Sequence, residues 1–375
     1  MIITSQFDSG NIRVIQATDP QNIKLAINPD NGSEFYQWFH FKLQSTKFVE
    51  HKLVITDLEK SAYPDGWPGY QAVASYDREE WFRVETSFHD NNLTIDFVPE
   101  YDSVYFAYFT PYSYERHQDF ISAAQMSFDC ELRHIGFTLD KRDMSLLVIG
   151  EEAEGKNKIW VTARQHPGES MAEWLVEGLV RRLLDEDDGV AKKLLEDNVF
   201  YVIPNMNPDG SARGHLRTNA VGTNLNREWK NPSEDKSPEV LYTLQAMDKY
   251  GVDMFLDIHG DEALPYNFVA GCEGNPNYNA RLEALETQFK EALLLATPEF
   301  QDVFGYAKDA PGTGNTAIAA NAVGHRFDCL SYTVEMPFKD NDNLPDPAYG
   351  WSAPRCQQLG EDLLIAIRAV SASLR

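Results

Sequence analysis

The segment "RQHPGESMAEW" places a histidine and a glutamate three residues apart, where a strand is expected to turn into a helix. Pro167 and Gly168 supply a tight turn that lets the side chains of His166 and Glu169 face one ion. A second histidine, His259, follows the apolar segment "VDMFLDI" on another expected strand. Two histidines and one carboxylate suit a catalytic zinc ion, because they leave a fourth position for water.

The spacing of these residues favours a hydrolase over a structural zinc module. His259 is distant in sequence from the first pair, whereas structural modules usually pair short spacings and prefer cysteine. The competing interpretation is an ordinary strand-to-helix turn with polar residues. Ser170 begins the expected helix and is its candidate N-cap. "HPGE" alone is weak evidence, so the metal interpretation depends on "DIHG" and "YTVE" following it in order.

Glu335 ends the apolar segment "LSYTV" and is the candidate general base. Zinc lowers the pKa of bound water to about 7 and polarises a carbonyl. A base must still take the water proton and return it to the leaving amine. The alternative is a surface carboxylate at the end of a strand, although full exposure would be unexpected after an apolar, β-branched run.

The segment "NPDGSARGHLRTNAVGTNLNREW" carries the candidate substrate contacts. It contains Arg213, Arg217 and the pair Asn226 and Arg227. One guanidinium can stabilise an oxyanion, and another can bind a carboxylate through two hydrogen bonds. The alternative for any one of these arginines is a basic surface loop.

The segments that must position these residues fall into two regions. Residues 1–112 contain short stretches rich in β-branched and aromatic residues, such as "KLVITDL" and "NLTIDFVP", separated by turn formers such as "YPDGWPG". Repeated short strands without helices predict an antiparallel β-sandwich. We therefore place a sandwich domain at 1–112 and a second domain at 113–375.

The second region alternates apolar strands with amphipathic helices. "KIWVTARQ", "VFYVIPNMN", "VDMFLDIHG" and "LSYTVEMPF" are nearly continuous apolar runs, and "SMAEWLVEGLVRRLLDE" is typical of the helices between them. This alternation predicts an α/β fold with a mixed, twisted sheet flanked by helices. Ligands of such sheets gather beyond the carboxyl ends of the strands, which is where the candidate residues fall.

Composition limits the partners and the compartment. The formal net charge of −25 argues against nucleic acid or an anionic membrane, since both require a basic face. We see no secretory signal and no apolar run long enough to span a bilayer. Four scattered cysteines without a CxxC motif indicate reduced thiols in a cytoplasmic protein.

The ordered set "ARQHPGES", "NPDG", "LRTNAVGTNLNREW", "LDIHGDE" and "SYTVEMPF" resembles the zinc metallocarboxypeptidases. The segments "YQWFHF" and "YFAYFTPYSYERHQDFI" resemble the β-sandwich domain of the cytosolic carboxypeptidase branch, in its bacterial type. The resemblance covers nearly the whole chain. It implies an exopeptidase that removes C-terminal residues from peptides or protein tails.

By this resemblance, one zinc ion per chain is bound by three residues: His166, Glu169 and His259. Glu335 is implied as general base and acid, and Arg217 as the group that stabilises the tetrahedral oxyanion. Asn226 and Arg227 are implied to hold the terminal carboxylate of the substrate. The tyrosine that helps to hold substrate in better-known carboxypeptidases has no clear counterpart, and Tyr306 is the nearest candidate.

Two departures from the family pattern bear on these expectations. Asn224 stands where the family usually has an aspartate that orients a zinc histidine, so we expect weaker zinc retention than with aspartate. Asn315, in "PGTGNTAIAA", stands where glutamate-removing members carry an arginine. A neutral amide cannot select an acidic side chain by charge, so glutamate specificity does not follow, although Lys308 or Arg326 could compensate.

Other functions stay open at this stage. Relatives with a similar zinc site hydrolyse small N-acyl amino acids, and a non-catalytic peptide-binding protein is a further alternative. The sandwich and the arginine-containing loop favour the peptidase, and a protein that only binds needs no base such as Glu335. The oligomeric state is not indicated by the sequence.

Overall fold

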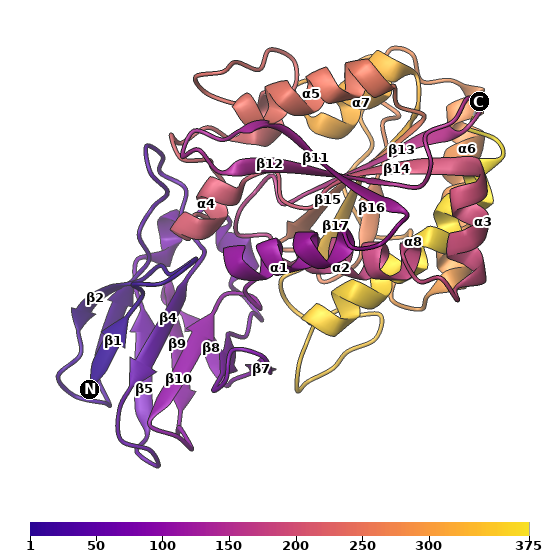
Figure 1. Ribbon diagram of the computed structural model, residues 1–375. Helices are drawn as coiled ribbons and strands as arrows, with labels where there is room; N and C mark the ends of the chain where they lie inside the picture. Colours follow the sequence, from indigo (N-terminus) through magenta and orange to yellow (C-terminus); the bar gives the residue numbers. More distant parts are fainter. Residues whose placement is uncertain (375) are drawn as a thin grey trace.

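Ten short strands form the N-terminal lobe of the computed structural model, which describes residues 1–374 (Figure 1). They build two five-stranded sheets, in the orders β1-β4-β10-β6-β7 and β2-β3-β5-β9-β8. All neighbouring strands in these two sheets are antiparallel except β3 and β5. The strands are β1 Ile2–Thr4, β2 Arg13–Gln16, β3 Ile23–Ala26, β4 His40–Gln44, β5 His51–Ile55, β6 Val73–Ser75, β7 Phe82–Arg83, β8 Thr86–His89, β9 Asn92–Phe97 and β10 Ser103–Ala107.

Aromatic side chains fill the space between these two sheets. The rings of Phe97 on β9 and Phe106 on β10 meet edge to face with centroids 5.3 Å apart. Phe106 also stacks on Phe41 of the neighbouring strand β4, at 5.4 Å. Phe41 and Phe106 are fully buried. The predicted antiparallel sandwich is confirmed.

The C-terminal lobe is built on a seven-stranded sheet in the order β11-β12-β14-β13-β15-β17-β16. Its four central neighbours, β14, β13, β15 and β17, are parallel, and the outer pairings are antiparallel. Parallel central strands direct their carboxyl ends to one edge of the sheet, where ligands bind. The strands are β11 Cys130–Phe137, β12 Asp143–Ile149, β13 Asn157–Ala163, β14 Asn198–Ile203, β15 Met254–Asp261, β16 Phe268–Ala270 and β17 Leu330–Pro337.

Helices cover both faces of this sheet, which confirms the predicted α/β architecture (Figure 1). Ile159 and Leu256 share a core with helices α2 and α8, whereas their strand neighbours Trp160 and Phe255 point to the opposite face, toward α5 and α7. Successive strand residues point to opposite faces, so a sheet buried on both faces needs continuous apolar strands. The helices are α1 Tyr114–Ala124, α2 Met171–Leu183, α3 Gly189–Asp197, α4 Pro208–Arg213, α5 Pro238–Tyr250, α6 Ala280–Ala296, α7 Ala319–Phe327 and α8 Ala353–Ser371.

Short segments that the sequence did not predict complete the fold. Helix α1 begins where the strand pattern of the N-terminal lobe stops, and the Ser113 side chain caps it by accepting from the Arg116 N–H at 3.1 Å. Three 3₁₀ turns are η1 Leu58–Lys60, η2 Pro64–Gly66 and η3 Leu225–Arg227. None of the helices within residues 1–374 is both long enough and apolar enough to cross a bilayer.

Glu239 in the first turn of α5 makes the stability of the fold depend on pH. Its side chain is fully buried, and burial raises its pKa to about 8. The Glu239 carboxyl therefore holds its proton more tightly in the folded protein than in the unfolded chain. As a result, the free energy of unfolding falls as pH rises from about 4.5 to about 8. We expect Glu239→Gln, which does not titrate, to exceed wild type by at least about 1 kcal/mol in unfolding free energy at pH 8.5, with a smaller gap at pH 5.

Urea denaturation at the two pH values measures this difference, and Glu283→Gln serves as the control. Glu283 is an exposed glutamate in the first turn of α6. A gap between Glu239→Gln and wild type that stays constant from pH 5 to pH 8.5 contradicts the assignment.

Candidate metal centre and active site

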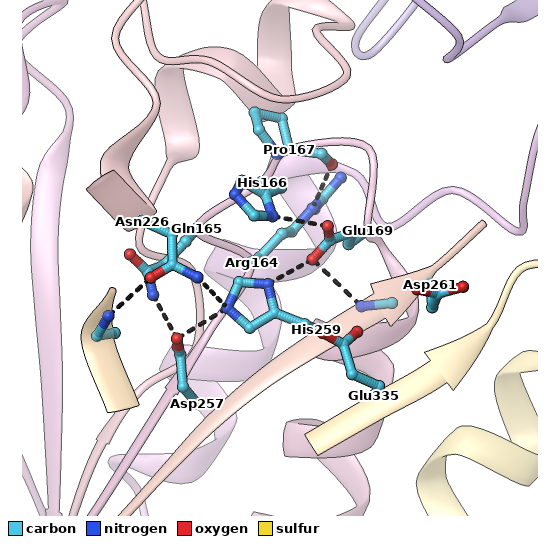
Figure 2. A network of polar contacts seen from close by, with 12 residues as sticks. Arg164, Gln165, His166, Pro167, Glu169, Asn226, Asp257, His259, Asp261 and Glu335 are labelled. Carbon is cyan, nitrogen blue, oxygen red and sulfur yellow. Dashed lines mark hydrogen bonds and ion pairs between the residues drawn. The ribbon is translucent and has the colours of Figure 1, made fainter. Parts of the chain in front are cut away.

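Three predicted ligands converge at the carboxyl edge of the central strands. One donor atom each from His166, Glu169 and His259 can be chosen so that all lie within 4.8 Å of one another, and all three residues are buried. The two oxygens of Glu169 face the two rings: Oε1 lies 2.7 Å from His166 Nδ1, and Oε2 lies 2.7 Å from His259 Nδ1 (Figure 2). The structure therefore brings together the three residues singled out in the sequence.

The turn between β13 and α2 is shaped by a close contact with a distant loop. The N–H of Gly168 donates to the carbonyl of Leu216 at 2.8 Å, and a Cβ at Gly168 would meet that oxygen at 3.0 Å. Glycine thus permits the approach of the two backbones. Ser170 stands at the N-cap position, but its hydroxyl donates to the carbonyl of Thr110 at 2.9 Å and caps nothing, which corrects the expected cap.

The Nε2 atom of each histidine has a different hydrogen-bond partner. His166 Nε2 lies 3.1 Å from the amide oxygen of Asn224, and His259 Nε2 lies 2.8 Å from the carboxylate of Asp257. Such contacts orient a ring and tune its basicity as a metal ligand. Asp257 was not predicted, although it stands two residues before His259 on the same strand, where side chains point to the same face.

Opposing charges dominate the electrostatics of this cluster. Burial lowers the pKa of His259, but Asp257 and Glu169 outweigh burial and raise it well above its ordinary value. Burial raises the pKa of Glu169, but His166 and His259 bring it below its usual range. Burial, and then Arg217, lower the pKa of His166 to about 4, so that its imidazole is neutral. The cluster thus offers an ionised carboxylate and a neutral imidazole to a cation.

Glu335 lies beside this cluster, paired in strand register with His259. Figure 2 shows the two side chains next to each other. Burial raises the pKa of Glu335 well above its usual range. Its Oε1 accepts from the Tyr306 hydroxyl at 3.2 Å, and its Oε2 has no hydrogen-bond partner among residues 1–374. A buried carboxylate oxygen without a partner requires a ligand or water beside it.

The predicted substrate contacts border the same space. Arg217 and Arg227 both line the cavity, and neither forms an ion pair with a carboxylate within the described chain. Asn226 also lines the cavity, but its amide nitrogen lies 3.3 Å from His259 Nε2 and its oxygen accepts from the Ala319 N–H at 2.8 Å. These two guanidinium groups, which no carboxylate of the described chain neutralises, could bind anionic groups of a ligand in this part of the cavity.

The cavity measures about 600 Å³, and its lining includes a second group of charged residues, which we call the recess. Lys308 pairs with Glu273 at 2.7 Å, and Lys290 pairs with Asp302 at 3.2 Å. Asp309 also lines the recess. Carboxylates therefore outnumber ammonium groups there, and the sequence had indicated only Lys308 among these residues.

The structure does not bring Asn315 to the cavity. Its side chain is exposed and accepts from the Ala317 N–H at 3.1 Å, within the turn that precedes α7. Ile318, just before α7, and Asn321, within α7, line the cavity instead. Tyr306 does reach the cavity, where its hydroxyl contacts Asp261 at 2.7 Å as well as Glu335.

The buried side chain of Arg164 stabilises the turn that carries His166 and Glu169. Arg164 is 1% exposed and adopts a φ of 58°. Its Nε donates to the carbonyl of Pro167 at 3.0 Å, and its Nη1 donates to Glu173 at 2.7 Å and to the carbonyl of Tyr112 at 2.8 Å. The other carboxylate oxygen of Glu173 lies 2.5 Å from the Nδ1 atom of His117. This buried network joins the turn to α1 and α2 and was not predicted.

Comparison with known proteins adds independent findings. Residues 120–359 match the family described as zinc carboxypeptidase, and residues 3–109 match the family described as cytosolic carboxypeptidase N-terminal domain. A metallo-carboxypeptidase from Pseudomonas aeruginosa, solved in complex with (2-guanidinoethylmercapto)succinic acid, is 49% identical, with a TM-score of 0.98 over 100% of both chains.

Two further relatives extend this comparison. A metallo-carboxypeptidase from Burkholderia cenocepacia is 49% identical, with a TM-score of 0.96 over 98% of both chains. Cytosolic carboxypeptidase 3 of Bos taurus is 25% identical over 90% of this chain, and the match spans 37% of that longer protein.

The network behind the turn makes Arg164 important for stability. Removing one partner of a buried ion pair costs about 3–5 kcal/mol, because the other charge stays buried. We expect Arg164→Met to lower the free energy of unfolding by about 3 kcal/mol or more, and Arg164→Met/Glu173→Gln to recover part of that loss. Urea denaturation measures both values.

Arg133 offers a matched control, since it pairs with Glu131 and Glu152 at the surface. Arg133→Met should cost about 1 kcal/mol or less. If Arg164→Met is no more destabilising than Arg133→Met, the proposed support of the turn is wrong.

Proposed function

The chain belongs to the zinc carboxypeptidase family and is a metallocarboxypeptidase, as the sequence predicted, and we propose that it uses one zinc ion to remove the C-terminal residue of peptides or protein tails. His166, Glu169 and His259 would hold the ion. Glu335 and Arg217 would carry out the catalysis, and Asn226 and Arg227 would bind the terminal carboxylate. The observation that carries this proposal is the pair of unpaired guanidinium groups beside the ligand cluster.

The donor set fits zinc on its own chemistry. Two imidazole nitrogens and a carboxylate face one another within 4.8 Å, in a buried position. Each imidazole has a hydrogen-bond partner on its other nitrogen, as metal-binding histidines usually do. When bound, zinc lowers the pKa of water and polarises the scissile carbonyl.

Glu335 would act on the protons of the reaction. Its partnerless Oε2 is the atom that would take a proton from the attacking water and later deliver it to the leaving amine. The hydroxyl of Tyr306 holds the other oxygen and so fixes the orientation of the carboxylate. A cation in the neighbouring cluster would favour the charged form of Glu335, opposing the effect of burial on its pKa.

The arginines would act on the negative charges of the substrate. Arg227 would bind the terminal carboxylate, which selects a free C-terminus over an internal peptide bond. Asn226 would also bind this carboxylate, and its amide would give up one of its present hydrogen bonds to do so. Arg217 would stabilise the charge that develops on the carbonyl oxygen.

A cytoplasmic location stays a prediction. All four cysteines are unpaired and buried in the structure. Free thiols are usual in reducing compartments, so this observation supports the prediction without testing it.

The first test separates metal binding from catalysis. We expect the purified protein to contain about one zinc ion per chain, and a chelator to abolish release of C-terminal residues until zinc is restored. Glu335→Gln should keep the zinc but lower kcat at least about 100-fold, because general base catalysis typically contributes that much. Metal analysis and a peptide hydrolysis assay measure the two effects.

Assays of N-acyl amino acids run in parallel distinguish the alternative amidohydrolase. Zinc-loaded protein that releases no C-terminal residue from any peptide would overturn the proposed activity. Full activity of Glu335→Gln would overturn the role of this residue alone.

The carboxylates of the recess favour a substrate whose C-terminal residue has a basic side chain. Burial raises the pKa of Glu273, but its contacts with Lys308 and the backbone keep it below its usual range, so Glu273 is ionised. Lys308 forms an ion pair with the Glu273 carboxylate, and the Lys308 side chain is 67% exposed. A substrate ammonium or guanidinium could therefore replace it. The ligand of the Pseudomonas aeruginosa relative likewise combines a guanidinium with carboxylates.

We therefore expect peptides ending in Lys or Arg to be cleaved with a higher kcat/KM than matched peptides ending in Glu, Phe or Ala. Glu273→Gln should lower kcat/KM for C-terminal Lys about 10-fold or more, with little effect on Phe, because one charge-assisted contact is lost. Glu283→Gln on the exposed face of α6 is the control. A preference for C-terminal Glu would show instead that Lys308 or Lys290 selects the side chain.

A further inference from the structure

We infer that Asp30, in the N-terminal lobe, is a positioning residue for Arg217, so that this lobe completes the active site of the enzyme. The inference rests on the proposed role of Arg217 in stabilising the oxyanion. The three proposed zinc ligands and Glu335 all lie in the C-terminal lobe, whereas Asp30 lies in the N-terminal lobe, between β3 and β4.

The carboxylate of Asp30 accepts four hydrogen bonds from the loop that carries Arg217. Its Oδ1 accepts from the Leu216 N–H at 2.7 Å. Its Oδ2 accepts from the N–H groups of Arg217 and Thr218, both at 2.8 Å, and from the Thr218 hydroxyl at 3.0 Å. Asp30 is only 3% exposed. Three consecutive backbone donors are thus fixed by a single buried charge from the other lobe.

The loop needs an external partner because it has little structure of its own. Residues 214–223 between α4 and η3 form neither helix nor strand. Asn31 donates its N–H to His215 Nε2 at 3.1 Å, next to the Asp30 contacts. A Cβ at Gly222 would meet the carbonyl of Gly32 at 2.5 Å, so two glycines let the backbones meet. Figure 1 shows α4, which leads into this loop, beside the N-terminal lobe.

The side chain of Arg217 is held by the same lobe. Its guanidinium lies 5.8 Å from the ring of Phe35 and 5.4 Å from the ring of Tyr63. Both rings offer cation–π attraction, which orients a guanidinium without neutralising its charge. Tyr63 also lines the cavity. The N-terminal lobe therefore fixes Arg217 at its backbone through Asp30 and at its charged end through two aromatic rings.

This arrangement suits a group that must stabilise transient charge. An ion pair with a carboxylate would cancel the charge of Arg217, whereas Asp30 contacts only the backbone and hydroxyl groups of the loop. Preorganised groups stabilise a transition state because they need no reorganisation during the reaction. Replacing the carboxylate of Asp30 with an amide removes the charge and one acceptor, so that the loop and the guanidinium lose their fixed position.

A double-mutant cycle in the full-length, zinc-loaded enzyme tests the inference. The variants are Asp30→Asn, Arg217→Met and the combination of the two, and the readouts are kcat, KM, zinc content and melting temperature. We expect Asp30→Asn to lower kcat at least about 10-fold while KM and zinc content change less than about twofold. In the Arg217→Met background, the same change should lower kcat less than about twofold, because its effect passes through Arg217.

Asp8→Asn is the matched control for damage to the contact between the lobes. Asp8 also accepts from a backbone N–H across this contact, that of Tyr114 at 3.0 Å, but it does not touch the Arg217 loop. Its substitution should leave kcat within about twofold of wild type. An equal loss of kcat in Asp8→Asn and Asp30→Asn would overturn the inference, since general loosening would then explain both.

Two further outcomes separate the inference from the proposed function. If Arg217→Met lowers kcat and Asp30→Asn does not, the role of Asp30 is wrong while that of Arg217 stands. If Arg217→Met leaves kcat unchanged, the proposed oxyanion role falls and the inference falls with it. Should Asp30→Asn be recovered unfolded, Asp30→Glu keeps the charge but shifts the loop by one methylene, and an unchanged kcat in that variant would overturn the inference.

Discussion

The carboxylate of Glu169 contacts two imidazoles at once, and the whole site is arranged around this interaction. Each of its oxygens lies 2.7 Å from the Nδ1 atom of one histidine. One of these histidines belongs to the same turn and the other to the next strand of the sheet, so the contact ties two strand ends together. Asn224 and Asp257, the outer partners of the two rings, hold these groups in place and set their charge balance.

Charge balance explains why the two histidines have different outer partners. Asp257 gives His259 a second anionic contact, whereas Asn224 offers His166 only a neutral oxygen. A second aspartate would add another negative charge to a centre that already holds Glu169, Asp257 and the buried Glu335. Arg217 lines the same cavity and disfavours a proton on His166. The neutral partner and the nearby guanidinium therefore act in the same direction, since both favour an unprotonated His166.

The sequence predicted the groups that local pattern controls. His166 follows β13, and His259 and Glu335 lie near the carboxyl ends of β15 and β17. Parallel strands bring these ends to one edge, so the convergence of the three residues could be predicted. Asn315 could not be placed, because residues 301–317 form no helix or strand and their path depends on contacts such as the Gly314 N–H with the Gly274 carbonyl. The short helices α1 and α7 were not predicted either, although α1 buries His117, Phe120, Ile121 and Ala124 at helical spacing.

Asp30 shows the limit of such reasoning most clearly. In the sequence it stands in "NPDNG", which is an ordinary turn, and its partners lie 186 to 188 residues further along the chain. No periodicity links the two segments, because neither is a helix or a strand. The link instead follows from hydrogen bonding. Two buried N–H donors and one partly buried N–H donor on an irregular loop require an acceptor, and no regular element supplies it. A loop without secondary structure that borders the cavity therefore needs an anchor elsewhere in the fold, and here the anchor comes from the lobe in which the sequence indicated no site residues.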